Sequence, residues 1–134
     1  MKIRILLFAC LFLLISCRTQ TTAPVANNNT VTIEINKKVK IPNANITLEF
    51  ANILEDSRCP ANVNCVWQGI AILDIHATSK QAPANFELAT MDFEPKKASQ
   101  SFSYAGYQFT LQSLTAQPGS KDKTPIATIG YTKE

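Results

Sequence analysis

Alternation of apolar and polar residues is the feature that most constrains how this chain folds. It is clearest in VTIEI (residues 31–35), ITLEF (46–50) and YQFTL (107–111). A repeat of two places the apolar side chains on one face of a β-strand and the polar ones on the other. Because no stretch after residue 17 carries a convincing helical stripe, the pattern predicts an all-β domain.

Turn-forming residues separate these alternating stretches. They include Pro42-Asn43, Ala105-Gly106 and Pro118-Gly119, and such short connections favour antiparallel pairing. The expected strands cover residues 30–35, 38–41, 45–55, 64–78, 85–91, 99–104, 107–116 and 125–132. About seven or eight short strands predict a small antiparallel β-sandwich or partly open barrel.

The first sixteen residues have the order of an export signal. MKIR carries two positive charges, and an apolar run follows that is too short to span a membrane. The run ends in Leu14-Ile15-Ser16-Cys17, which resembles the lipobox of bacterial lipoproteins. That resemblance implies cleavage before Cys17 and acylation of Cys17, with palmitate among the chains. Two or more chains hold a protein stably on a bilayer, so we expect a lipid-anchored protein of the bacterial cell envelope.

Composition bounds what remains after cleavage. The chain has 134 residues, and one domain accounts for the part after the signal. Removal of Lys2 and Arg4 leaves 11 of the 13 basic residues against 10 acidic ones, so no nucleic-acid partner is expected. Residues 17–29 are polar and aperiodic, which predicts a flexible tether of at most roughly 40 Å. Residues 30–134 form the predicted single β domain, which we expect to be a monomer.

In the sorting pattern of Gram-negative lipoproteins, an aspartate directly after the lipidated cysteine favours retention at the inner membrane. Arg18 occupies that position here, so the outer membrane is the expected destination.

The stretch DSRCPANVNCVWQG, residues 56–69, holds the two remaining cysteines. Export to an oxidising compartment favours a disulfide between Cys59 and Cys65, with a chain-entropy contribution of about 2.4 kcal/mol. Pro60 disfavours helical geometry at Cys59, so the bond is expected to clip the turn between the third and fourth strands. Trp67 would share a strand face with Cys65, cover the disulfide and fill the end of the core. Gly69 would mark a bulge or make room for the ring.

Other chemistries fit these residues poorly. A metal site needs three or four ligands, whereas His76 is expected at the far end of a strand from Cys65, on the opposite face. A redox centre usually has two residues between its cysteines, and five intervene here. His76 lies beside Asp74 without a nucleophile motif. No catalytic residue, metal or cofactor is therefore assigned.

Asp56 and Arg58 flank the cysteine stretch. They are expected to pair with each other, to fix the backbone of the loop, or to contact a partner. Together with Trp67 they define a candidate partner-binding corner, because loops on a fixed scaffold often carry recognition.

The residues Asp56-Ser57-Arg58-Cys59-Pro60, Val63, Cys65-Val66-Trp67 and Gly69 resemble a signature of uncharacterised exported bacterial proteins, often lipoproteins. Here Gln68 replaces the usual small residue. The resemblance covers most of residues 30–132 and implies a small all-β domain, without an activity or catalytic residues.

The sequence therefore predicts a non-enzymatic binding or structural module, anchored to the membrane through Cys17. Its partner would be another envelope protein or an extracellular ligand. Two alternatives stay open: a protease inhibitor, and an envelope hydrolase that uses Asp56, Asp74, Glu55 or His76.

Overall fold

The computed structural model describes residues 29–134. The predicted signal peptide, the acylation of Cys17 and the tether as far as residue 28 lie outside the described residues. The strands are β1 (Thr30–Glu34), β2 (Lys37–Lys40), β3 (Thr47–Asp56), β4 (Ala71–Thr78), β5 (Ala84–Ala89), β6 (Ser101–Tyr104), β7 (Tyr107–Leu114) and β8 (Ile126–Lys133). A short 3₁₀ turn, Glu94–Lys96, lies between β5 and β6. Within residues 29–134, no helix has the length and hydropathy needed to cross a membrane.

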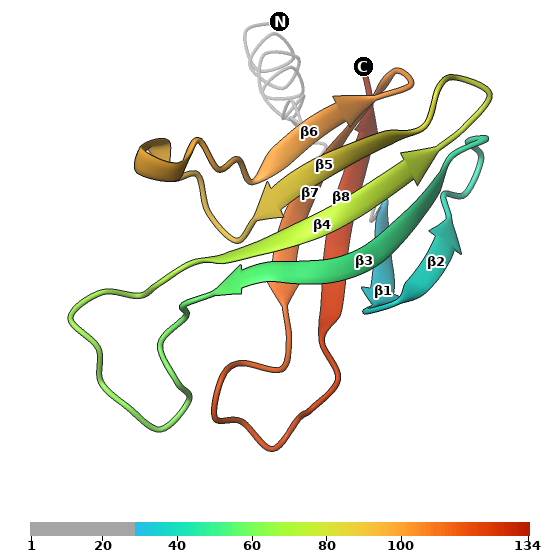
Figure 1. Ribbon diagram of the computed structural model, residues 1–134. Helices are drawn as coiled ribbons and strands as arrows, with labels where there is room; N and C mark the ends of the chain where they lie inside the picture. The colour runs from blue at the N-terminus through green and yellow to red at the C-terminus, as the bar shows by residue number, and fades with distance from the viewer. Residues whose placement is uncertain (1–28) are drawn as a thin grey trace, which may run out of the picture.

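The eight strands form two antiparallel sheets that face each other. Sheet A has the order β1-β8-β7-β6 and sheet B the order β2-β3-β4-β5. Figure 1 shows the two sheets as layers whose strands cross. The sheets do not close into a barrel, so the sandwich prediction is confirmed.

Apolar residues of the inner faces fill the space between the sheets. The large side chains that are at most 2 % exposed in this core are Ile33, Ile41, Ile46, Leu48, Phe50, Leu73, Ile75, Leu88, Phe109, Leu111 and Ile129. Ile41 and Ile46 lie in the connection between β2 and β3, and the others come from strands of both sheets, as the alternation requires. Full burial of such a side chain contributes about 1.5–3 kcal/mol.

The turn predicted at Ala105-Gly106 is confirmed, and it joins β6 and β7 in an antiparallel hairpin. Tyr104 pairs with Tyr107 across two residues of positive φ, Ala105 at 51° and Gly106 at 77°. Positive φ at both central positions is the type I′ geometry that matches the twist of paired strands.

A second, smaller core lies on the outer face of sheet B. It contains Ile70, Ile72, Ala89 and Ala98, with Met91 and Phe93 packed against it. The segment between β5 and β6 supplies Met91, Phe93 and Ala98 and folds back through the 3₁₀ turn. This packing covers sheet B at the end where β3 passes into β4.

One predicted strand is wrong in part. Residues 64–78 were expected to be one strand, but β4 begins at Ala71. Gly69 has φ of 75°, far from the φ of regular strand residues, and the chain before it turns to close the disulfide. Further along, Leu73, Ile75 and Ala77 point into the core as the alternation predicts.

Candidate functional site

The corner loop, residues 57–70, connects β3 to β4 and carries the disulfide. Cys59 and Cys65 are bonded, with their Cα atoms 5.9 Å apart, which confirms the predicted pair. The arms of the loop stay paired beyond the strands, since Ser57 N donates to Ile70 O at 2.8 Å and Cys59 N to Gln68 O at 2.9 Å. The corner loop is therefore a narrow paired neck that ends in a closed ring.

Gly69 makes this neck possible. It is buried and has φ of 75°. A Cβ atom at Gly69 would lie 1.9 Å from the carbonyl oxygen of Ser57 on the opposite arm. The glycine was expected to mark a bulge or make room for an aromatic ring; the space that it leaves is instead occupied by backbone.

Arg58 ties the corner loop to sheet A. Its Nε and Nη2 donate to the two carboxylate oxygens of Asp56, at 2.8 and 2.7 Å. Its Nη1 donates to Leu114 O at 2.7 Å, and Nη2 also donates to Ala116 O at 3.1 Å. The Arg58 side chain is 12 % exposed and that of Asp56 20 %. Asp56 and Arg58 therefore pair with each other, and the fixed fork of the guanidinium joins the two sheets.

The loop between β7 and β8, residues 115–125, lies against the corner loop. Gln117 Nε2 donates to Cys59 O at 2.6 Å, and Ala61 N donates to Pro118 O at 3.0 Å. Ala116 has φ of 55°, a left-handed conformation that costs a non-glycine residue roughly 1–2 kcal/mol. The hydrogen bond from Arg58 to the Ala116 carbonyl supports that conformation. Both loops project from the same end of the sandwich (Figure 1).

Exposed apolar side chains gather at this end. Within residues 29–134, the exposed large hydrophobic residues are Leu54 at 51 %, Val63 at 57 %, Val66 at 111 % and Trp67 at 49 %. Three of them belong to the corner loop, and no charged residue occurs from Cys59 to Ile70. We call Val63, Val66 and Trp67 the apolar tip.

Trp67 does not fill the end of the main core, so that prediction is wrong. Its ring packs on Phe93, with centroids 5.3 Å apart, at the margin of the smaller core. The prediction failed because Trp67 was placed within a continuous strand, whereas the corner loop carries the ring to the outside of sheet B. Trp67 therefore stays about half exposed.

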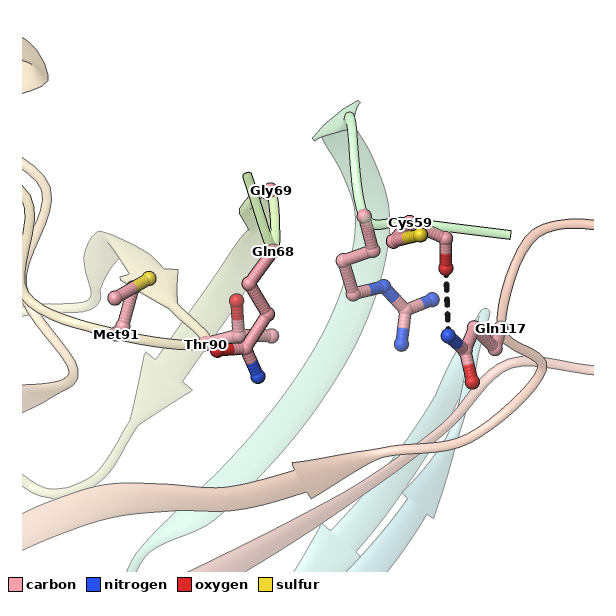
Figure 2. Close-up of a pocket in the computed structure, with 7 residues that line it drawn as sticks. Cys59, Gln68, Gly69, Thr90, Met91 and Gln117 are labelled. Atoms are coloured by element: carbon pink, nitrogen blue, oxygen red, sulfur yellow. Dashed lines mark hydrogen bonds between the residues drawn. The ribbon is translucent and has the colours of Figure 1, made fainter. Parts of the chain in front are cut away.

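A hollow of about 310 Å³ opens beside the apolar tip. It is lined by Arg58, Cys59, Gln68, Gly69, Thr90, Met91 and Gln117. Figure 2 shows Gln68, Thr90 and Met91 on one side, and Cys59 on the other, where Gln117 donates to its carbonyl. The hollow therefore lies where three loops of the fold meet.

The polar cluster around His76 is separate from the corner. His76 Nε2 lies 3.1 Å from Asp74 Oδ2, and Nδ1 lies 3.8 Å from Glu49 Oε2. Because Ile75 and Ala77 point into the core, His76 lies on the outer face of sheet B, with its side chain 34 % exposed. Glu55 pairs with Lys96 of the 3₁₀ turn. In the part of the chain that the structure describes, no group of three or more His, Cys, Asp or Glu side chains is placed to hold a metal ion.

Sequence reasoning missed Gln117, Pro118, Met91 and Phe93 as neighbours of the corner. The strands on either side of these residues were predicted, but contacts between loops leave no periodic signal. The one available hint was the turn at Pro118-Gly119, which indicated a loop without indicating what it touches.

Comparisons of the chain with protein-family models, with curated proteins and with solved structures found no match. The likeness of the corner motif to exported bacterial domains therefore stays a prediction, and function is inferred from the geometry of the site.

The two glycines Gly69 and Gly106 give a matched test of the neck. Both have left-handed backbones, with φ of 75° and 77°, but a Cβ at Gly106 would meet nothing within 4 Å. Gly106→Ala should lower the free energy of unfolding by about 1 kcal/mol, from backbone strain alone. Gly69→Ala should lower it by about 3 kcal/mol or more, because the neck must open. Urea denaturation measures both, and equal losses would contradict the close approach of Gly69 to Ser57.

Proposed function

We propose that this protein is a lipid-anchored, non-enzymatic binding module of the bacterial cell envelope, and that the apolar tip of its corner loop is the contact surface. The observation that carries the proposal is the apolar tip, which is exposed and uncharged. The loop that carries it is hydrogen-bonded to both sheets through Arg58. Acylation of Cys17 would provide the anchor, and an outer-membrane destination follows from Arg18. The partner would be another envelope protein.

The position of Asn29 indicates which end of the sandwich the predicted tether would join. Tyr131 N donates to Asn29 O at 2.8 Å, near the end of β8. The β7–β8 loop lies at the start of β8, and Ile126 and Tyr131 are about 17 Å apart along the strand. A tether that ends beside Tyr131 would join the sandwich at the end opposite the apolar tip. The tip would then lie away from the point of attachment, free to meet a protein in the aqueous space.

The chemistry of the tip suits protein recognition. Trp is enriched among the residues that dominate binding energy, and apolar anchors do best where water is excluded. The neck, the disulfide and Arg58 fix the tip before a partner binds, which reduces the entropy lost on association. A protease whose substrate cleft accepts the tip is one such partner, so inhibition belongs within this proposal.

A hydrolase has weaker support. Asp56 is bonded to Arg58, and it pairs in register with Ala71, about 17 Å along β4 from His76. The two groups therefore cannot act on one substrate bond. His76 and Asp74 do pair, but on an open sheet face where water screens their interaction.

Replacement of Cys17 tests the anchor. Cys17→Ala should move the protein from the membrane fraction to the soluble fraction, because no thiol remains to be acylated. Fractionation and intact-mass analysis of the parent and variant provide the measurement. A parent chain without acyl mass, or a variant that stays in membranes after a carbonate wash, would contradict the anchor.

Charge placed at the tip tests the contact surface. A photocrosslinking residue at Asn64 should capture a discrete envelope protein, and that protein, once purified, should bind the parent. Val63→Asp with Val66→Asp should weaken the binding about tenfold or more. Stability should hardly change, because both side chains project into solvent.

Thr132→Asp, at the end of the sandwich opposite the tip, is the matched control and should bind as the parent does. Equal binding by the tip variant and the parent would contradict the proposal, as would capture of lipid alone at position 64.

A further inference from the structure

The hollow beside the apolar tip presents unused hydrogen-bonding groups. The Gln68 side chain takes part in none of the hydrogen bonds found among the described residues. Gln117 uses Nε2 toward Cys59 and retains its Oε1 acceptor. Thr90 Oγ1 accepts from Ala71 N at 3.1 Å, which leaves the hydroxyl proton available. Donors and acceptors are thus interspersed around one space.

The hollow has no net charge to attract an ion. Arg58 is its one charged lining residue, and Asp56 neutralises it through two hydrogen bonds. Four of the five guanidinium N–H groups are committed, to Asp56 and to the carbonyls of Leu114 and Ala116. An anion would therefore find at most one free guanidinium N–H group and otherwise only neutral donors, and the lining offers no carboxylate to a cation.

The wall of the hollow also has an apolar part. Met91 lines it and packs against the smaller core, whose margin carries Trp67 on Phe93. A thioether adapts to side chains of different shapes. No aromatic ring is among the lining residues, so the hollow lacks the flat stacking surface that would suit a sugar.

We infer that the hollow binds a neutral peptide segment, with main-chain amides facing Gln68, Gln117 and Thr90 and one apolar side chain against Met91. A peptide group offers one donor and one acceptor, which is what two carboxamides and a hydroxyl complement. This inference rests on the proposed function, since the segment would belong to the protein that meets the apolar tip. The tip would then enter the partner while the hollow receives a strand or loop from it.

A small peptide analogue tests the inference directly. N-acetyl-leucine N′-methylamide, titrated into the full ¹⁵N-labelled chain in detergent, should shift the Gln68 side-chain amide and the backbone amide of Met91. A Kd of about 1 mM is expected for a ligand of this size. Gln68→Leu should raise the Kd about fivefold, the effect of one or two neutral hydrogen bonds. Gln108→Leu makes the same change on the exposed face of sheet A and should leave the Kd unaltered.

Three results would overturn the inference: no shifts at Gln68 and Met91, an equal effect of the two leucine variants, or equal binding of acetate or N-acetylglucosamine. The proposed function is tested separately, by partner binding of the tip variant. If the tip variant loses its partner while the peptide analogue fails to bind, only the inference is lost. If the analogue binds while the tip variant keeps its partner, the tip is not the contact surface.

Discussion

The position of the corner loop on the sandwich depends on the guanidinium of Arg58. Two sheets of a sandwich meet through their inner faces, but a loop that projects beyond both must be attached by other contacts. Arg58 attaches the corner loop to sheet A, because its planar fork binds Asp56 at the end of β3 and two carbonyls at and just beyond the end of β7. Lysine cannot reproduce this geometry, since one ammonium presents no fixed fork. The cost of burying the charge is offset because nearly every donor is satisfied.

The disulfide has a different task. It closes a ring between Cys59 and Cys65, which shapes the apolar tip without joining it to the sandwich. Gly69 then lets the arms of the loop approach at backbone distance, and Gln117 holds Cys59 from the neighbouring loop. Sheet A therefore fixes the position of Arg58, Arg58 fixes the neck of the corner loop, and the neck fixes the ring that carries Val66. Exposed apolar side chains are thereby presented on a fixed frame, which is the arrangement that recognition favours.

Most of the fold could be predicted because alternation records which face of a strand is buried. The inward positions of β1, β3, β7 and the second half of the 64–78 segment follow from it. The alternation pattern failed at Cys65, Trp67 and Gly69, which have the spacing of strand residues but lie in a loop. The left-handed backbone of Gly69 and the closed ring end the strand there, and neither has a periodic signature. The pairing of Asp56 with Arg58 was within reach of the sequence, whereas their bonds to Leu114 and Ala116 depend on contacts 56 and 58 residues away.

Native-state hydrogen exchange tests the role of Arg58 most directly. The amides of Cys59 and Ala61, which donate to Gln68 O and Pro118 O, should be protected in the parent protein. In Arg58→Lys their exchange should quicken about tenfold or more, a loss of about 1.4 kcal/mol in local stability, while Leu73 in the core of β4 keeps most of its protection. Unprotected amides at both positions in the parent, or unchanged exchange in the variant, would show that the corner is not held by Arg58.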